Sequence, residues 1–404
     1  MINSDNILDR AKELQDELIQ NRRHLHKNPE LFMELPNTVA FVQQKLKEMG
    51  IESTKLGGGV VANIGDSTKG KTILLRADMD ALPIKEETGL EFASINNAMH
   101  ACGHDVHTSS LLGAAKILKE NEDSINGNVK LMFQPGEEVL AGAKAMIDEG
   151  ILENPKVDAA MMIHVFSGFD VEPGKLLLPK VGAASMAPDE FHIYIQGKGG
   201  HGAMPHTAID PLNIAAHTHI SLQELISRET NPGEKAICIV GHMSGGEAGN
   251  VMADTAKMVG SIRTVNPKTR EFLKNRIIEI SEGVAKTFRG SARVEYTVQC
   301  PSVINDVKMR EFGNTFGIEL FGDSNVEPLD SYMDGGMLSG SEDFSFISEL
   351  VPSFMSIISM GSTNDGYEFS HHHPKTDFDE REFYKSAAYY AYYALKYLES
   401  EVGN

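Results

Sequence analysis

Residues 99–108 read Met-His-Ala-Cys-Gly-His-Asp-Val-His-Thr and run directly into an apolar stretch, residues 109–118, that is predicted to be helical. Ten residues thus carry one thiol, three imidazoles and one carboxylate. Soft and borderline donors at this density suit a transition metal, zinc first, with manganese, cobalt or nickel as alternatives. Taken alone, the stretch fits a polar loop with a buried cysteine and surface histidines equally well. The surrounding segments therefore decide whether residues 99–108 form a metal-binding loop.

Composition and charge limit the class of protein. The chain has 404 residues, of which 41% are hydrophobic, and this length predicts two or three domains. A formal net charge of -20 disfavours nucleic acid and anionic membranes as partners, because both attract a basic face. The sequence shows no secretory signal and no stretch typical of a membrane span, and Cys102, Cys238 and Cys300 are too few and too scattered for a disulfide framework. We therefore expect a cytoplasmic protein in which Cys102 is a free thiol.

Three apolar runs each end in side chains that can ligate or support a metal. Residues 71–77 lead into Asp78-Met79-Asp80, residues 128–134 into Pro135-Gly136-Glu137-Glu138, and residues 157–163 into His164. Short runs that are almost entirely apolar are typical of strands covered on both faces. Strands and helices alternate between residues 60 and 165, which predicts an α/β fold with a mainly parallel sheet flanked by helices. Open sheets of this kind place their active sites at the carboxyl ends of the strands.

The pattern changes in the middle of the chain. Residues 190–196 alternate strictly between apolar and polar side chains, as a half-buried antiparallel strand does. We predict an α+β domain at residues 186–299, with a four-stranded antiparallel sheet and two helices, inserted between residues 1–185 and 300–404 of a discontinuous first domain. In the inserted domain the remaining strands are expected at residues 236–242, 255–263 and 292–300, and the helices at residues 210–228 and 268–287. In the first domain, helices are expected at residues 5–27, 38–49, 141–149 and 380–399.

Several of these side chains are ambiguous when each is taken alone. In Glu137-Glu138 one carboxylate can ligate a metal while the other acts as a general base, but acidic pairs are also common on surfaces. His164 can be a core histidine, and His371-His372-His373 can be an exposed loop. Arg263, at the end of a predicted strand, can bind a substrate carboxylate with its bidentate fork or form a structural ion pair. Only their combination points to one site.

Taken together, the motifs resemble those of the M20 metallopeptidase family, in its amidohydrolase branch. That branch includes N-acyl-amino-acid amidohydrolases, hippurate hydrolases, plant auxin-conjugate hydrolases and N-acetyl-diaminopimelate deacetylases. The motifs occur in family order along nearly the whole chain: Arg76-Ala77-Asp78-Met79-Asp80-Ala81-Leu82-Pro83, residues 99–108, Gln134-Pro135-Gly136-Glu137-Glu138, residues 199–206 with Asp210-Pro211, Ser341-Glu342-Asp343-Phe344-Ser345 and His372-His373-Pro374.

The resemblance implies a site for two divalent metal ions, Zn²⁺ or Mn²⁺, with Co²⁺ or Ni²⁺ as alternatives. The implied ligands are Cys102 as a bridge between the ions, His104 and His164 in one site, and Glu138 and His372 in the other. His372 is preferred because it lies two residues before Pro374, and His371 and His373 remain alternatives.

The resemblance also implies the catalytic and substrate-binding groups. Glu137 would be the general base. Apart from the resemblance, we expect Asp78 and Asp80 to orient ligand histidines, because a metal-bound histidine usually needs a carboxylate or carbonyl partner, and we count Asp80 with the catalytic group. His201 would stabilise the oxyanion, often from the partner subunit, while Asn250 and Arg263 would lie near the carboxylate end of the substrate. Residues 186–299 would then be a lid and dimerisation domain, so a homodimer through this domain is expected.

We therefore predict metal-dependent hydrolysis of the amide bond of N-acyl amino acids, such as N-acetyl or N-benzoyl derivatives, which releases a carboxylic acid and an amino acid. The expected partner is this small molecule or a short peptide. A dipeptidase or aminopeptidase of the same family and an N-acetyl-diaminopimelate deacetylase are the enzymatic alternatives. A binding protein that keeps the fold without catalysis is the non-enzymatic alternative, and the presence of Glu137 argues against it. The acyl group, the amino acid and the native metal remain open.

Overall fold

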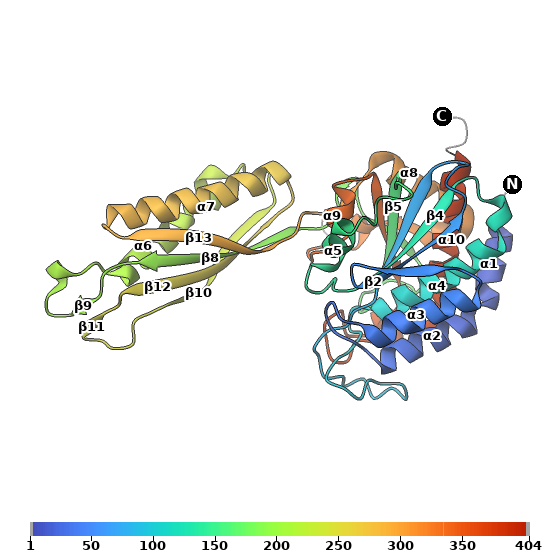
Figure 1. Cartoon of the computed structure of the whole chain (residues 1–404), viewed down its shortest axis with the longest axis horizontal. Helices are drawn as coiled ribbons and strands as arrows, with labels where there is room; N and C mark the ends of the chain where they lie inside the picture. The colour runs from blue at the N-terminus through green and yellow to red at the C-terminus, as the bar shows by residue number, and fades with distance from the viewer. Residues whose placement is uncertain (1–2, 334, 401–404) are drawn as a thin grey trace. The chain divides into compact units, whose positions relative to one another are not determined.

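The computed structural model describes residues 3–333 and 335–400, and the chain divides into two compact units (Figure 1). Unit 1 comprises Met1–Ala184, Val303–Leu338 and Glu342–Asn404, and unit 2 comprises Ser185–Ser302 and Ser339–Ser341. Unit 1 contains two hydrophobic clusters and unit 2 contains a third.

An eight-stranded sheet forms the centre of unit 1, in the strand order β1-β2-β4-β3-β5-β16-β6-β15. The four central strands β4, β3, β5 and β16 run parallel, while β1 and β2 form an antiparallel hairpin at one edge. The predicted mainly parallel sheet is therefore confirmed. Its strands are β1 (Ser53–Leu56), β2 (Gly59–Gly65), β3 (Thr72–Asp78), β4 (Asn128–Gln134), β5 (Ala159–Phe166), β6 (Leu176–Leu178), β15 (Val326–Pro328) and β16 (Ser353–Ser359), and β7 (Gly182–Ala183) pairs separately with β14 (Ile304–Asn305).

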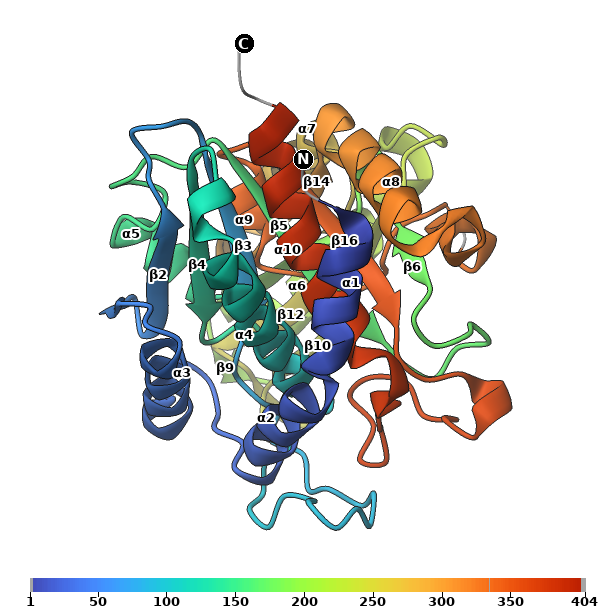
Figure 2. The same cartoon turned by 90° about the vertical axis from the view of Figure 1, so that its right-hand side faces the viewer.

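Both faces of this sheet are buried. Along β3, Ile73 and Leu75 contribute to the larger hydrophobic cluster, and Leu74 between them contributes to the smaller one on the opposite face. Helices α1, α2, α3, α4, α8 and α10 cover the larger cluster, and α5 and α9 cover the smaller one (Figure 2). The helices are α1 (Ser4–Glu13), α2 (Gln15–Lys27), α3 (Pro36–Glu48), α4 (His104–Glu120), α5 (Gly142–Asp148), α8 (Val307–Phe321), α9 (Ser345–Ser348) and α10 (Phe383–Ser400).

A buried arginine fixes two segments that carry predicted ligands. Arg22 on α2 donates from Nε to Asp105 in the first turn of α4, at 2.9 Å, and its other nitrogens reach Asp377 at 3.1 Å and Glu380 at 3.0 Å. The guanidinium is fully buried, so these three carboxylates compensate its charge. Arg22 therefore ties the start of α4 to the segment just after residues 371–373.

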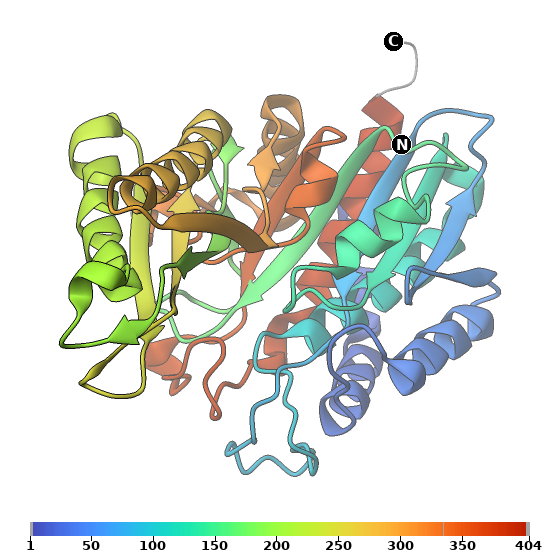
Figure 3. The ribbon, with the colours of Figure 1, turned by 60° about the vertical axis from the view of Figure 1, so that its left-hand side comes forward.

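A long loop separates β3 from α4. A bridge between Leu82 and Met99 closes its base, and the light-blue loop of residues 83–98 projects away from the sheet (Figure 3). Its Glu86 accepts a hydrogen bond from His26 on α2 at 3.1 Å, and the backbone N–H of Glu87 donates to the carbonyl of Pro374. The loop thus contacts α2 and the histidine-rich segment.

Unit 2 consists of a four-stranded antiparallel sheet and two long helices, as predicted. The strand order is β10-β12-β8-β13, and α6 and α7 pack on one face of the sheet (Figure 1). The elements are β8 (Ala187–Gln196), β10 (Ala236–Gly245), β12 (Thr255–Thr264), β13 (Ser291–Gln299), α6 (Pro211–Leu222) and α7 (Pro267–Thr287), with β9 (Gly200–His201) pairing β11 (Val251–Met252) in a separate short ladder.

Several element boundaries differ from the sequence-based expectations. The helix expected at residues 5–27 is interrupted at Leu14, whose N–H bonds to both Arg10 and Ala11 and tightens the turn. The helix expected at residues 109–118 begins at His104, because Gly103 starts it with a left-handed φ of 84°. Strand β5 continues to Phe166, because its parallel ladder with β16 continues there, so His164 lies within the strand.

The helix expected at residues 210–228 ends at Leu222 and is followed by a π turn over Leu225–Glu229. The C-terminal helix begins at Phe383, after a short 3-10 turn over Glu380–Glu382 that Asp379 caps. Over residues 3–333 and 335–400, the helices are all too short or too polar to cross a bilayer.

Candidate metal centre

The sheet order brings the predicted strand ends together. Strands β4, β3 and β5 are parallel neighbours, so their carboxyl ends lie side by side. This brings together the segment after Gln134, the segment after Asp78 and the end of β5. Helix α4 begins at the same place, and the side chain of Thr108 ties it to the end of β3 by donating to the carbonyl of Asp78 at 2.8 Å. Four segments that are far apart in the sequence therefore share one corner of unit 1.

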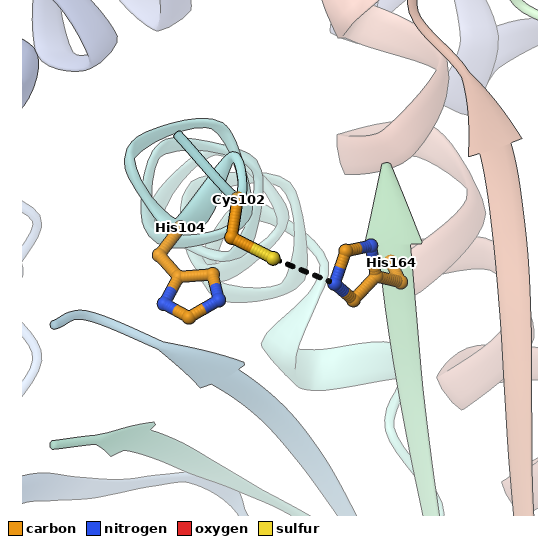
Figure 4. Close-up of side chains that lie close together, drawn as sticks. All are labelled: Cys102, His104 and His164. Atoms are coloured by element: carbon orange, nitrogen blue, oxygen red, sulfur yellow. Dashed lines mark hydrogen bonds between the residues drawn. The ribbon is translucent and has the colours of Figure 1, made fainter. Parts of the chain in front are cut away.

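Cys102, His104 and His164 form the first group of potential ligands. Their ligand atoms all lie within 4.8 Å of one another, and the three side chains are buried. The Sγ of Cys102 is 3.6 Å from Nε2 of His164, as the dashed line in Figure 4 shows. Gly103, between Cys102 and His104, has no room for a side chain, since a Cβ there would lie 2.5 Å from Val165 and 2.9 Å from Phe378.

Cys102, Glu138 and His372 form a second group with the same spacing. Nε2 of His372 lies 3.4 Å from Oε1 of Glu138, and the His372 side chain is 53% exposed. Contacts with Cys102 and Glu138 raise the pKa of His372 to about 10. Cys102 belongs to both groups, so its thiol is the point that the two groups share.

The histidines are oriented as metal ligands require. The Nδ1–H of His104 donates to the carbonyl of Asp80, and that of His164 donates to the carbonyl of Val165, both at 2.8 Å. A carbonyl can only accept, so Nε2 of each imidazole is left with a free lone pair. Nε2 of His104 and Oε1 of Glu138 are buried without a hydrogen-bond partner among the described residues. A divalent metal ion would satisfy both atoms, and thiol, imidazole and carboxylate donors suit it.

Asp80 holds the two glutamates in place. Its carboxylate accepts the backbone N–H of Glu137 at 3.0 Å and that of Glu138 at 3.2 Å. Glu137 belongs to a group with His104 and Glu138 and lies 3.9 Å from His104 Nε2. Burial, reinforced by Glu342, raises the pKa of Glu137 well above its ordinary value. A buried carboxylate with a raised pKa beside ligating side chains can take and release a proton.

A buried arginine balances the carboxylates behind Glu137. Arg76 contacts Asp78 at 2.8 Å, Glu342 at 2.9 Å and Asp343 at 2.8 Å, and all four side chains are buried. Burial raises the pKa of Asp343 to about 7. In the sequence, Glu342 and Asp343 could be recognised only as members of a family motif, without a role of their own. Their position behind Glu137 could not be found from periodicity, because they lie about 200 residues away in a different segment.

The three consecutive histidines lie in different surroundings. His372 faces Cys102 and Glu138, whereas His371 packs between Phe166 and Phe378, and His373 stacks on Phe369 with ring centroids 4.3 Å apart. Backbone geometry separates them, since His372 has a left-handed φ of 63°. Among the three, His372 is the one within the described ligand groups.

The other predicted site residues lie in unit 2. The short ladder of β9 and β11 places His201 next to the segment of Asn250, whose carbonyl accepts the N–H of Gly202 at 2.9 Å. Nδ1 of His201 accepts the N–H of Ala203 at 3.0 Å, so Nε2 carries the proton in the neutral imidazole. Arg263, on β12, donates to Ser341 Oγ at 3.2 Å.

Comparison with known proteins agrees with this geometry. Residues 74–396, well over half of the chain, match the family described as "Peptidase family M20/M25/M40". The chain belongs to the M20 peptidase family. This confirms the family resemblance drawn from the motifs, and relatives named as an N-acetyl-L-cysteine deacetylase and a hippurate hydrolase confirm its amidohydrolase branch.

Relatives in the M20 family carry three informative descriptions. An N-acetyl-L-cysteine deacetylase of Bacillus subtilis (strain 168) is 38% identical over 95% of this chain and 89% of that protein. A hippurate hydrolase of Campylobacter jejuni is 36% identical over 98% of this chain and 100% of that protein. A crystal structure from Bacillus subtilis, described as a dinuclear metal binding peptidase of the M20 family, is 30% identical, with a TM-score of 0.81 over 96% of this chain and 99% of that one.

Proposed function

We propose that this M20 protein hydrolyses the amide bond of N-acyl amino acids and releases a carboxylic acid and an amino acid. One observation carries the proposal: the buried carboxylate of Glu137 lies beside a cluster of thiol, imidazole and carboxylate donors at the carboxyl ends of the parallel strands. The printed activities of the relatives from Bacillus subtilis and Campylobacter jejuni, a deacetylase and a hippurate hydrolase, support this substrate class.

We infer a site for two divalent metal ions, zinc or manganese, with cobalt or nickel as alternatives. Cys102 would serve both ions, with His104 and His164 in one set and Glu138 and His372 in the other, because Cys102 belongs to both ligand groups. When bound, such ions lower the pKa of water and polarise a carbonyl oxygen. The dinuclear relative supports the number of ions.

Glu137 is the proton carrier in this proposal. Its carboxylate takes a proton from the attacking water as the new C–O bond forms at the acyl carbon. The same proton goes to the amide nitrogen as the C–N bond breaks, so the amine leaves neutral and Glu137 returns to its starting state. Asp80 keeps Glu137 in position through the backbone N–H that it accepts.

We propose that unit 2 is a lid that supplies residues to the bound substrate. His201 offers an Nε2–H donor for the developing oxyanion, because its Nδ1 already accepts a hydrogen bond from Ala203. Arg263 has no ion pair within the described part of the chain, so its guanidinium is available to a substrate carboxylate, with Asn250 as a second contact.

A homodimer through unit 2 is also proposed. Strand β10 is an edge of its sheet and exposes Ile237 (48%) and Ile239 (55%). The opposite edge, β13, carries exposed Arg293 and Glu295, the kind of charged residues that prevent edge pairing. A second copy that pairs along β10 would extend the sheet and bring its own side chains against the two isoleucines, which share one face of the strand.

Ile239→Lys is therefore expected to make the protein monomeric. Burial of an unpaired ammonium costs more than the roughly 1.4 kcal/mol that a tenfold rise in the dimer Kd requires. Sedimentation velocity over a concentration series measures this, with Thr297→Lys on β13 as the control that should remain dimeric. A wild-type monomer, or an Ile239→Lys dimer of unchanged Kd, would exclude this interface.

A substrate panel tests the proposed reaction against its alternatives. The metal-loaded protein is offered N-acetyl and N-benzoyl amino acids, N-acetyl-diaminopimelate and free dipeptides, and released amine is measured. We expect turnover of N-acyl amino acids and little of free dipeptides. Preferential cleavage of free dipeptides would support a dipeptidase instead, and a metal-loaded protein that is inert across the panel would favour a binding role.

A further inference from the structure

Two imidazoles bond to the backbone of Val165, one to the peptide group on each side of its Cα. Nε2 of His107 accepts the Val165 N–H at 2.8 Å, and Nδ1–H of His164 donates to the Val165 carbonyl at 2.8 Å. His164 is a proposed ligand, whereas His107 has no part in the proposed reaction.

The Val165 N–H needs a side-chain partner because two strands separate there. Strands β3 and β5 pair only as far as Arg76 and Met162. Beyond that point Tyr390 bridges them, since its hydroxyl accepts the N–H of Ile163 at 2.9 Å and donates to the carbonyl of Arg76 at 2.7 Å. Val165 lies two residues further along β5, so its N–H points to the same side of the strand, where His107 takes the place of the missing strand.

The other nitrogen of His107 is fixed as well. Nδ1 donates to Asp78 Oδ1 at 2.6 Å, and Asp78 Oδ2 accepts from Arg76 at 2.8 Å. His107 is 1% exposed, so solvent does not compete for either bond. With Nδ1 protonated and Nε2 accepting from Val165, both nitrogens are used and none remains to ligate a metal.

We propose that His107 is a positioning residue, which transmits the orientation of Asp78 through the backbone of Val165 to His164. The bond from His107 holds the peptide group between His164 and Val165, and this fixes the backbone that carries the next carbonyl, that of Val165. This carbonyl accepts from Nδ1 of His164, so Nε2 faces Cys102. Rotation about the backbone of Val165 would move the carbonyl away from Nδ1 and misalign the imidazole. The inference rests on the metal site of the proposed function, but it does not depend on which substrate is hydrolysed.

Two substitutions separate the two bonds of His107. The amide N–H of asparagine can replace Nδ1–H as the donor to Asp78, but asparagine is too short to reach the Val165 N–H. Glutamine is longer, and its amide oxygen can replace Nε2 as the acceptor of the Val165 N–H. We expect His107→Asn to weaken the binding of one of the two metal ions by about 10- to 100-fold, the range observed when a residue that orients a metal ligand is lost. The affinity for the other ion should be unchanged. His107→Gln should restore most of the lost affinity. His24→Asn, at an exposed histidine of α2, is the matched control.

Metal affinity is measured by titration of metal-free protein with Co²⁺, and the thiolate-to-cobalt absorption reports the geometry at Cys102. Unchanged affinity and spectrum in His107→Asn would overturn the proposal. Loss of one equivalent in both His107→Asn and His107→Gln would also overturn it, because His107 would then be a ligand. Two tightly bound ions with no amide hydrolysis would contradict the proposed function and leave this inference intact.

The wild-type protein provides a second test that needs no variant to fold. With ¹⁵N-labelled histidine and ¹¹³Cd²⁺ as the bound ion, His107 is expected to be the Nδ1-protonated tautomer without coupling to cadmium, while His104 and His164 show that coupling. Cadmium coupling to His107, or the opposite tautomer, would contradict the assignment.

Discussion

Replacement of Glu137 by glutamine is expected to lower kcat by about 10²–10⁴-fold, the range that a positioned general base contributes. Glutamine preserves the size of the side chain but cannot carry a proton from water to the leaving amine. The backbone N–H that Asp80 accepts is unaffected, so the turn before Glu138 should keep its shape. Metal content should therefore remain at the wild-type value while turnover is lost.

Initial rates and elemental analysis of the same Glu137→Gln sample provide this comparison. Glu349→Gln, at an exposed glutamate after α9, is the control and should retain full activity. Activity of Glu137→Gln within a few-fold of wild type would mean that another group carries the proton. Loss of metal together with activity would place Glu137 among the ligands instead.

Cys102→Ala should weaken the binding of both metal ions. A four-ligand zinc site in a small protein gains about 10–16 kcal/mol on binding, so one thiolate contributes on the order of 3 kcal/mol to each ion, which is more than about 100-fold in affinity. Because Cys102 belongs to both ligand groups, the two equivalents should weaken together. This pattern differs from the one expected for His107→Asn, where a single equivalent is affected.

Competition with a chromophoric chelator measures both affinities in Cys102→Ala. Cys238→Ala is the matched control, since Cys238 lies in unit 2 and burial raises the pKa of its thiol to about 11. If Cys102→Ala weakened only one equivalent, the thiol would belong to one ion and the bridging role would be wrong. Unchanged affinity for both would remove Cys102 from the site.

Much of unit 1 could be predicted from the sequence because its strands are covered on both faces. The apolar run at residues 128–134 is the observed strand β4, and β3 differs from its predicted range by one residue at each end. Neighbouring parallel strands have their carboxyl ends side by side. The sequence therefore predicts that Asp78, Asp80, Glu137 and Glu138 lie close together at these ends. Burial pattern and strand direction were sufficient for these residues.

The remainder of the site depends on tertiary structure that periodicity does not encode. His164 lies inside β5 because the ladder with β16 continues past the expected end of the strand. The choice of His372 among three adjacent histidines depends on a left-handed backbone turn, and the roles of Glu342 and His107 depend on contacts between distant segments. No local pattern in a single sequence distinguishes these cases.

Metal content measured together with activity tests most directly whether this M20 protein is a metal-dependent amidohydrolase. The protein is analysed for bound metals, and its hydrolysis of N-acetyl and N-benzoyl amino acids is measured before chelation, after chelation and after metal is added back. We expect two ions per chain, activity that disappears on chelation and activity that returns with metal. A protein that binds no metal even after reconstitution, or that hydrolyses these substrates equally well without it, would contradict the account.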